Sequence, residues 1–152
     1  MIEDTNTEFM DATALNTGAA GTYLIGNVID LGSARDVGDG EPVFLVITVD
    51  TGIQVASGTG TVQFVLASDS AAAISTSTSQ RHLVTAAFAT STTPIAAGTV
   101  LYAAALPKGL AQAYKRYLGI LQITGTTAIS AGKINALLTR DAPNFVAMPA
   151  AI

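Results

Sequence analysis

Apolar residues alternate with polar ones along most of this chain, in the two-residue period of β-strands. In residues 61–68, for example, Val62, Phe64 and Leu66 fall on one face, opposite Thr61 and Gln63. The pattern predicts strands at 21–30, 43–50, 61–68, 82–88, 99–106, 117–124 and 133–140. Turn-forming residues separate these runs: GDGEP, TG at 51–52, SGTG, TTP, PKG and TGTT. Several short strands with such turns predict a β-sandwich or a β-barrel.

The run VFLVITVD (43–50) is apolar on both faces. Val43, Leu45, Ile47 and Val49 share one face, and the other face also carries apolar side chains. A strand that is apolar on both sides is typical of the middle of a sheet that is covered on both faces. We therefore expect residues 43–50 to form an interior strand.

Three segments do not follow the strand pattern. In residues 110–117, apolar side chains recur at helical spacing, which fits a turn or two of helix, although an extended loop is an equal alternative. Residues 68–80 are rich in Ser, Thr and Ala and predict a long surface loop. Both ends look unlike globular core. Residues 1–20 are an N-terminal arm or a first edge segment, 21–141 the folded domain, and 142–152 a proline-containing extended tail.

The C-terminal tail has two interpretations. It is either a frayed terminus or an arm that lies on a neighbouring subunit, where Phe145, Met148 and Ile152 would be covered.

Charged residues make up only 12% of the 152-residue chain, against about 25% in typical soluble domains. Such a surface suggests that partners cover much of it. The charges are also unevenly distributed. Residues 1–70 hold ten of the eleven acids and one base, giving −9, and residues 71–152 hold one acid and six bases, giving +5. This division predicts either an internal seam between opposite charges or complementary patches between copies.

Composition excludes several classes of function. The chain has no cysteine, so disulfides, zinc–thiolate sites and thiol nucleophiles are absent. A net charge of −4 argues against a general nucleic-acid binder. The acidic N-terminus does not resemble a secretory signal, and the longest weakly polar run, 94–107, is too short to span a bilayer. We therefore expect a soluble, non-secreted protein that binds neither nucleic acid nor membrane.

The acidic corner DVGDGEP, at residues 36–42, is the first candidate site. Asp36, Asp39 and Glu41 could in principle bind calcium, but the twelfth position of an EF-hand loop counted from Asp36 is Ile47, inside the apolar strand. The glycines and the proline fit a turn instead. We interpret the corner as architecture with solvated or partner-facing carboxylates, and we expect no cofactor.

His82 is the only histidine and is the second candidate. A Ser-His-Asp triad with Asp69 is numerically possible, but the nucleophile-elbow pattern G-x-S-x-G is missing and serine is too common here to be informative. We therefore predict that the protein is not an enzyme. Arg116, directly before an apolar strand, is expected to hold a loop through backbone carbonyls, or else to contact an acidic partner.

Three ordered stretches resemble the jelly-roll capsid cement proteins of tailed bacteriophages, across roughly residues 28–141. They are VIDLGSARDVGDGEPVFLVITVD, TVQFVLASDSAAAIS and LPKGLAQAYKRYLGILQITGTTAISAGKINALLTRD. The resemblance implies an all-β antiparallel jelly-roll β-sandwich; the extended N- and C-terminal segments are expected from the residues alone, because both termini fall outside the match. It also implies a homodimer or homotrimer on the outer surface of the virion head, made in the host cytoplasm, that binds the major capsid protein.

On this hypothesis the candidate contacts with the capsid or between subunits are charged residues and the apolar residues of the tail. They are Asp36, Asp39, Glu41, Lys108, Lys115, Arg116, Phe145, Met148 and Ile152. The alternative is a receptor- or glycan-binding β-sandwich of a phage tail or fibre. A hydrolase that uses His82 is a more distant third possibility.

Overall fold

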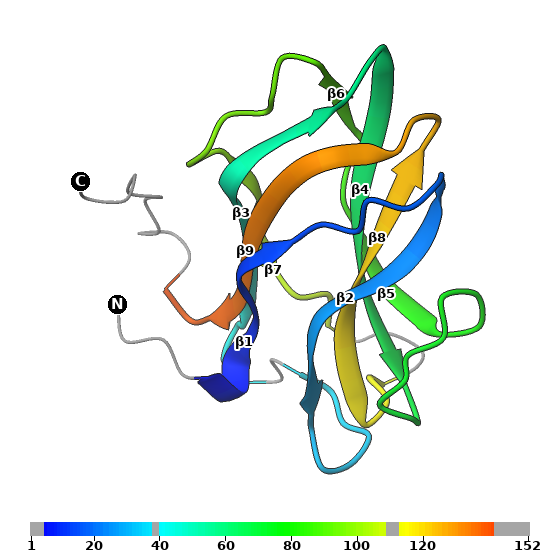
Figure 1. Cartoon of the computed structure of the whole chain (residues 1–152). Helices are drawn as coiled ribbons and strands as arrows, with labels where there is room; N and C mark the ends of the chain where they lie inside the picture. Colours follow the sequence, from blue (N-terminus) through cyan, green and yellow to red (C-terminus); the bar gives the residue numbers. More distant parts are fainter. Residues whose placement is uncertain (1–4, 38–39, 109–112, 142–152) are drawn as a thin grey trace.

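The chain folds into two antiparallel β-sheets that pack face to face (Figure 1). The computed structural model describes residues 5–37, 40–108 and 113–141. These contain a 3-10 turn, η1 (Thr5–Thr7), and the strands β1 (Glu8–Ala14), β2 (Gly21–Asp30), β3 (Phe44–Val55), β4 (Thr59–Asp69), β5 (Gln80–Val84), β6 (Phe88–Ser91), β7 (Val100–Ala105), β8 (Tyr117–Gly125) and β9 (Ile129–Thr139). Within the described ranges, no helix is long and apolar enough to cross a membrane.

The strand order is that of a jelly roll. Sheet A has the order β1-β9-β3-β7, and sheet B the order β2-β8-β4-β5, with β6 also paired to β4. From β1 to β4 the chain changes sheet at every step, and it does so again from β6 to β9. The first and last strands, β1 and β9, are neighbours in sheet A, as in a jelly roll made of two Greek keys. The predicted all-β jelly-roll sandwich is confirmed.

The core lies between the sheets and follows the predicted alternation. In β4, Val62, Phe64 and Leu66 face sheet A and belong to the main core cluster. Val65 and Ala67 point to the outer face of sheet B, where they form a second, smaller cluster with Ile74 and others. Sheet B is thus apolar on both faces over part of its area.

β3 confirms one prediction and corrects another. It is an interior strand, between β9 and β7, as its two apolar faces predicted. However, the turn expected at Thr51-Gly52 is wrong, because β3 continues to Val55 and returns Ile53 and Val55 to the core. Two register shifts around Thr51 bend the strand instead of ending it. A Cβ on Gly52 would lie 2.9 Å from the Cβ of Pro94, so glycine here allows the 92–98 connection to approach.

The strand predicted at 82–88 is two strands. β5 and β6 both pair with β4, and residues 85–87 separate them. Thr85 explains the break, because its Oγ1 accepts a hydrogen bond from the Phe64 backbone N–H (3.0 Å) and donates one to the Ala86 carbonyl (2.9 Å). A side chain that bonds its own backbone competes with a regular ladder.

The N-terminal residues take part in the core. β1 is an edge strand of sheet A that pairs with β9, and Phe9 and Met10 are fully buried. For residues 8–14 the structure therefore shows the first edge segment, one of the two alternatives given for residues 1–20, and the expectation that this stretch looks unlike globular core is wrong. Its pattern was hidden because β1 carries two acids and two register shifts, which break the simple alternation.

A buried glutamine fixes the connection between β1 and β2. Gln122 in β8 is fully buried; its Nε2 donates to the Asn16 carbonyl (2.9 Å) and to Thr124 Oγ1 (2.8 Å), and its Oε1 accepts from the Asn16 N–H (2.8 Å). The amide is thereby satisfied, as a buried polar group must be. The 15–20 connection is consequently held against sheet B.

For residues 110–117 the sequence left two alternatives, a short helix or an extended loop. Residues 109–112 lie outside the described residues. From residue 113 onward the chain is not helical: Tyr114 forms an isolated antiparallel bridge with Arg35, and β8 begins at Tyr117. This part therefore runs as an extended segment beside the β2–β3 connection.

Candidate functional site

The two ends of the sandwich differ in charge. At the lower end in Figure 1, β2, β4 and β9 end and β3, β5 and β8 begin. We call this the charged end, made of the described residues 30–37, 40–43, 69–80, 106–108, 113–117 and 139–141, and it holds all three ion pairs found among the described residues. The loops at the opposite end, 15–20, 56–58, 92–99 and 126–128, contain no charged residue. Of the two ends, only the charged end could therefore dock through charges.

Arg116 joins the start of β8 to the end of β2. Its guanidinium makes two hydrogen bonds of 2.8 Å to the Asp30 carboxylate and lies 4.9 Å over the ring of Tyr117. The hydrogen bonds from Arg116 lower the pKa of Asp30 to about 2, and Asp30 raises the pKa of Arg116. The predicted bonding to backbone carbonyls is wrong: Arg116 does hold a loop, but through a carboxylate.

The other two ion pairs also join residues that are far apart in the sequence. Lys115 Nζ lies 3.6 Å from Asp69, and Arg140 lies 2.7 Å from Glu41. In each of the three pairs the acid comes from residues 1–70 and the base from residues 71–152. The uneven charge along the chain thus forms an internal seam, because the jelly roll places the ends of early strands beside the starts or ends of late ones. The Glu41 and Arg140 side chains are 71% and 77% exposed, so this pair is open to exchange with a partner.

The β2–β3 connection, which carries the acidic corner, runs beside residues 113–116, which carry Lys115 and Arg116. The Arg35 N–H donates to the Tyr114 carbonyl (3.0 Å) and the Leu31 N–H to the Arg116 carbonyl (2.8 Å). Burial, and next the nearby Asp36, raises the pKa of Tyr114 to about 12. Gly40 has φ +93°, which confirms turn geometry at this position of the corner.

The remaining predicted residues fall in two groups. Lys108 is exposed at the charged end. Asp39 of the corner, and Phe145, Met148 and Ile152 of the tail, lie outside the described residues. In the part of the chain that the structure describes, no three His, Asp or Glu side chains are grouped as a metal site would need.

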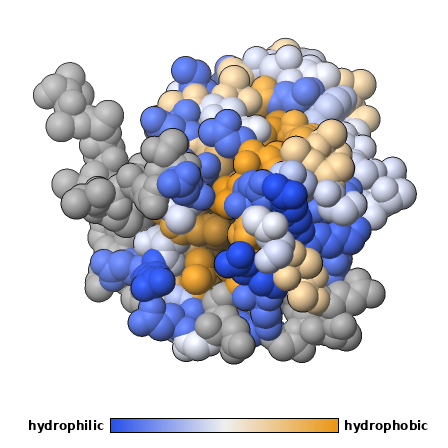
Figure 2. Space-filling view, turned by 90° about the horizontal axis from the view of Figure 1, so that it is seen from below, coloured by the Kyte–Doolittle hydropathy of each residue, from blue (hydrophilic) through white to orange (hydrophobic). Residues whose placement is uncertain are grey.

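Apolar side chains also gather at the charged end. Figure 2 views the molecule from below and shows them near the centre of this end, with polar side chains around them. Among the residues of this region, Ile29, Leu31, Val37 and Val43 are partly buried and pack against the core. An apolar centre within a polar rim is the usual anatomy of a protein–protein interface.

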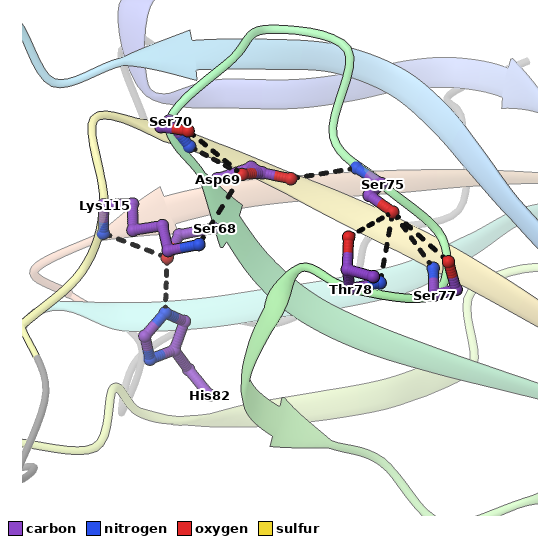
Figure 3. A network of polar contacts seen from close by, with 8 residues as sticks. All are labelled: Ser68, Asp69, Ser70, Ser75, Ser77, Thr78, His82 and Lys115. Atoms are coloured by element: carbon purple, nitrogen blue, oxygen red, sulfur yellow. Dashed lines mark hydrogen bonds and ion pairs between the residues drawn. The ribbon is translucent and has the colours of Figure 1, made fainter.

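A polar network behind this surface includes the only histidine (Figure 3). Ser68 Oγ lies 2.7 Å from His82 Nε2 and accepts a hydrogen bond of 3.0 Å from the Lys115 backbone N–H. The Ser68 hydroxyl proton is then free to bond His82 Nε2, so Nε2 accepts this hydrogen bond and the imidazole is neutral. The His82 ring stacks on Tyr114 with centroids 3.9 Å apart, and Tyr114 Oη donates to the Pro107 carbonyl (2.9 Å).

This network does not have the geometry of a catalytic triad. Ser68 is fully buried, and His82 Nδ1 is buried without a hydrogen-bond partner. The carboxylate of Asp69 instead accepts from the backbone N–H groups of Ser70 (2.7 Å) and Ser75 (3.1 Å). In a catalytic triad the carboxylate accepts a hydrogen bond from the histidine and thereby orients the ring. The arrangement instead fixes residues 113–116 against sheet B. Sequence reasoning missed Ser68, because nothing distinguishes it from the many other serines.

The long surface loop predicted at 68–80 spans residues 70–79 in the structure, and its own side chains hold it in place. Ser75 Oγ bonds Ser77 and Thr78 (Figure 3). Ile74 is buried on the outer face of sheet B, where a Cβ on Gly119 would lie 2.7 Å from Ile74 Cδ1. Gly119 therefore leaves the space that Ile74 fills, and the loop covers part of an apolar sheet face.

Comparison with known proteins gives one positive result. No curated protein matches the chain. A family model described as Bbp16 matches residues 9–138, from the second residue of β1 to the penultimate residue of β9. Because this match covers most of the chain and all of the strands that form the jelly roll, the protein belongs to the Bbp16 family.

Proposed function

We propose that this protein is a capsid cement protein of a tailed bacteriophage. It binds the outer surface of the assembled head and stabilises contacts between major capsid protein subunits. The observation that carries the proposal is that Asp36, Glu41, Lys108, Lys115 and Arg116, chosen from the sequence as capsid contacts, lie together at the charged end. The jelly-roll order and the resemblance across residues 28–141 support it.

The mechanism requires binding but no chemistry. A protein that binds only the assembled lattice stabilises that lattice by mass action. Each contact need bury only about 800 Å² per partner, because an oligomer that bridges several subunits gains through effective concentration. The mixed charges of the charged end would select the orientation of docking, since opposite charges on a partner can replace the exposed internal pairs. The head withstands internal pressure from DNA without this protein touching nucleic acid.

The direct test uses heads that lack the protein. Adding the purified protein should raise the survival of such heads on heating and on osmotic shock, and it should sediment with them. Unchanged survival would disprove cementing. Binding to a glycan array by the isolated protein, with no binding to heads, would favour the receptor-binding alternative.

A pair of variants tests the surface itself. Lys108→Glu reverses a charge at the charged end, and Lys133→Glu makes the same change on the exposed face of β9, away from that end. We expect K108E to weaken head binding on the order of tenfold, with a reduced salt dependence, and K133E to bind like the wild type. Equal effects of the two variants would refute docking through the charged end.

A further inference from the structure

The four sheet edges of the molecule are not equally protected against pairing with another chain. β1 carries Glu8 and Asp11 and has two register shifts. β2 is interrupted between Ile25 and Ile29, where Gly26 has φ +71°. β5 and β6 are strands of five and four residues separated by a break. Charges, bulges and short length are the devices by which edge strands avoid new partners.

β7 has none of these devices over its C-terminal half. Its sequence is VLYAAA, and no charged residue occurs between His82 and Lys108. Its only register shift lies before Tyr102, and residues 102–105 pair regularly with β3. β7 ends the order of sheet A, so none of the described strands lies on its outer side.

The ladder to β3 shows which backbone groups are open. The Leu106 N–H donates to the Val43 carbonyl (2.8 Å), so Leu106 directs its backbone groups toward β3. In the register with β3, residues 104 and 102 do the same. In an antiparallel ladder the residues between them direct N–H and C=O groups away from β3. Ala103 and Ala105 therefore present four unpaired backbone groups along the edge, and both side chains are exposed methyl groups.

We propose that the β7 edges of two copies of this protein pair antiparallel about a two-fold axis, so that sheet A continues from one copy into the other. Ala103 then lies opposite Ala103 of the other copy, and the open N–H of each meets the open C=O of the other, since the pattern is self-complementary under a two-fold rotation. The methyl side chains allow strands to approach to about 4.8 Å without steric conflict.

A second copy fits this edge better than a charged strand, because the pairing brings no like charges together. In this register Lys108 lies opposite Gly98 of the other copy. The two lysines are consequently on the order of 30 Å apart, at about 3.3 Å for each residue between them, well beyond the screening length of about 8 Å in physiological salt. The interface uses a side of sheet A, and it leaves the charged end free. It depends on this chain alone and not on capsid binding.

Cysteine cross-linking tests the register. The chain contains no cysteine, so a single introduced thiol can form a disulfide only between copies. Opposed residues of a hydrogen-bonded pair have Cα atoms about 5.5 Å apart, within disulfide range. Mild oxidation of Ala103→Cys should yield mostly disulfide-linked dimer, whereas Ala72→Cys, an exposed alanine of the 70–79 loop, should remain largely monomeric. Equal yields from the two variants would overturn the proposal.

Proline substitution tests the hydrogen bonds. Ala103→Pro removes an N–H that faces the open edge, where proline is tolerated, so the fold should keep its melting temperature. Wild type should sediment as a concentration-dependent dimer and A103P as a monomer. A wild type that stays monomeric up to about 1 mM, or an A103P variant that dimerises equally, would refute the pairing. Cross-linking of A103C to capsid subunits and never to itself would assign the edge to a capsid strand instead.

Discussion

Acid should destabilise this protein through its single histidine. Burial, and next the nearby Lys115 ammonium, lowers the pKa of His82 from 6.5 to about 4. The imidazolium is disfavoured in the folded state, where Nε2 is needed as the acceptor for Ser68, whereas the unfolded chain binds the proton at the ordinary pKa. The contribution of His82 to stability is therefore fully present above pH 6.5 and is lost as the pH falls towards about 4.

The size of the effect follows from the two pKa values. A difference between 6.5 and about 4 corresponds to roughly 3 kcal/mol, at about 1.4 kcal/mol per pH unit. The ring is only partly buried, so solvent screening reduces this figure. We expect the free energy of unfolding to fall by about 1 kcal/mol between pH 7 and pH 5. The pKa values of Asp30 and Asp69 are lowered from 3.8, so their contributions to stability change mainly below that pH. The change between pH 7 and pH 5 is therefore assigned to His82.

Urea unfolding followed by circular dichroism at pH 7, 6 and 5 measures the fall. His82→Gln, which does not titrate and keeps an acceptor near Ser68, is the matched control and should show a flat profile over this range. Because the chain has one histidine, its ring gives a single set of NMR signals whose titration reports the pKa directly. A measured pKa at or above 6.5, or an H82Q profile that falls as steeply as that of the wild type, would refute the reasoning.

Three further predictions concern the core and the loops. Gln122→Ala should cost about 1–3 kcal/mol, because it leaves buried backbone groups of the 15–20 connection unpaired; an unchanged melting temperature would contradict this. Phe64→Ala, at a fully buried site, should cost about 3–5 kcal/mol in urea unfolding, and a cost under about 1 kcal/mol would count against the core described here. Asp69→Ala removes the acceptor for two backbone N–H groups and should speed proteolysis within 70–79; a wild-type cleavage pattern would show that the loop is held by other contacts.

Local sequence signals were sufficient for most of the strands. The alternation in 61–68 and the two apolar faces of 43–50 lead directly to β4 and to an interior β3, because side chains on a strand alternate between faces whatever surrounds them. The same rule failed where backbone irregularities change the period. It missed β1, with its two register shifts, and it merged β5 and β6 across the break at Thr85.

The candidate site divides in the same way. The uneven distribution of acids and bases along the chain was visible in the sequence, and it left open whether the charges would meet within one molecule or between copies. Only the jelly-roll topology, which brings residues 30 and 116 or 69 and 115 together, decided that they pair internally at one end. Long-range contacts of this kind depend on sheet order, which no local pattern encodes. The Ser68–His82 contact and the open edge of β7 arise for the same reason: each depends on which strand lies beside which.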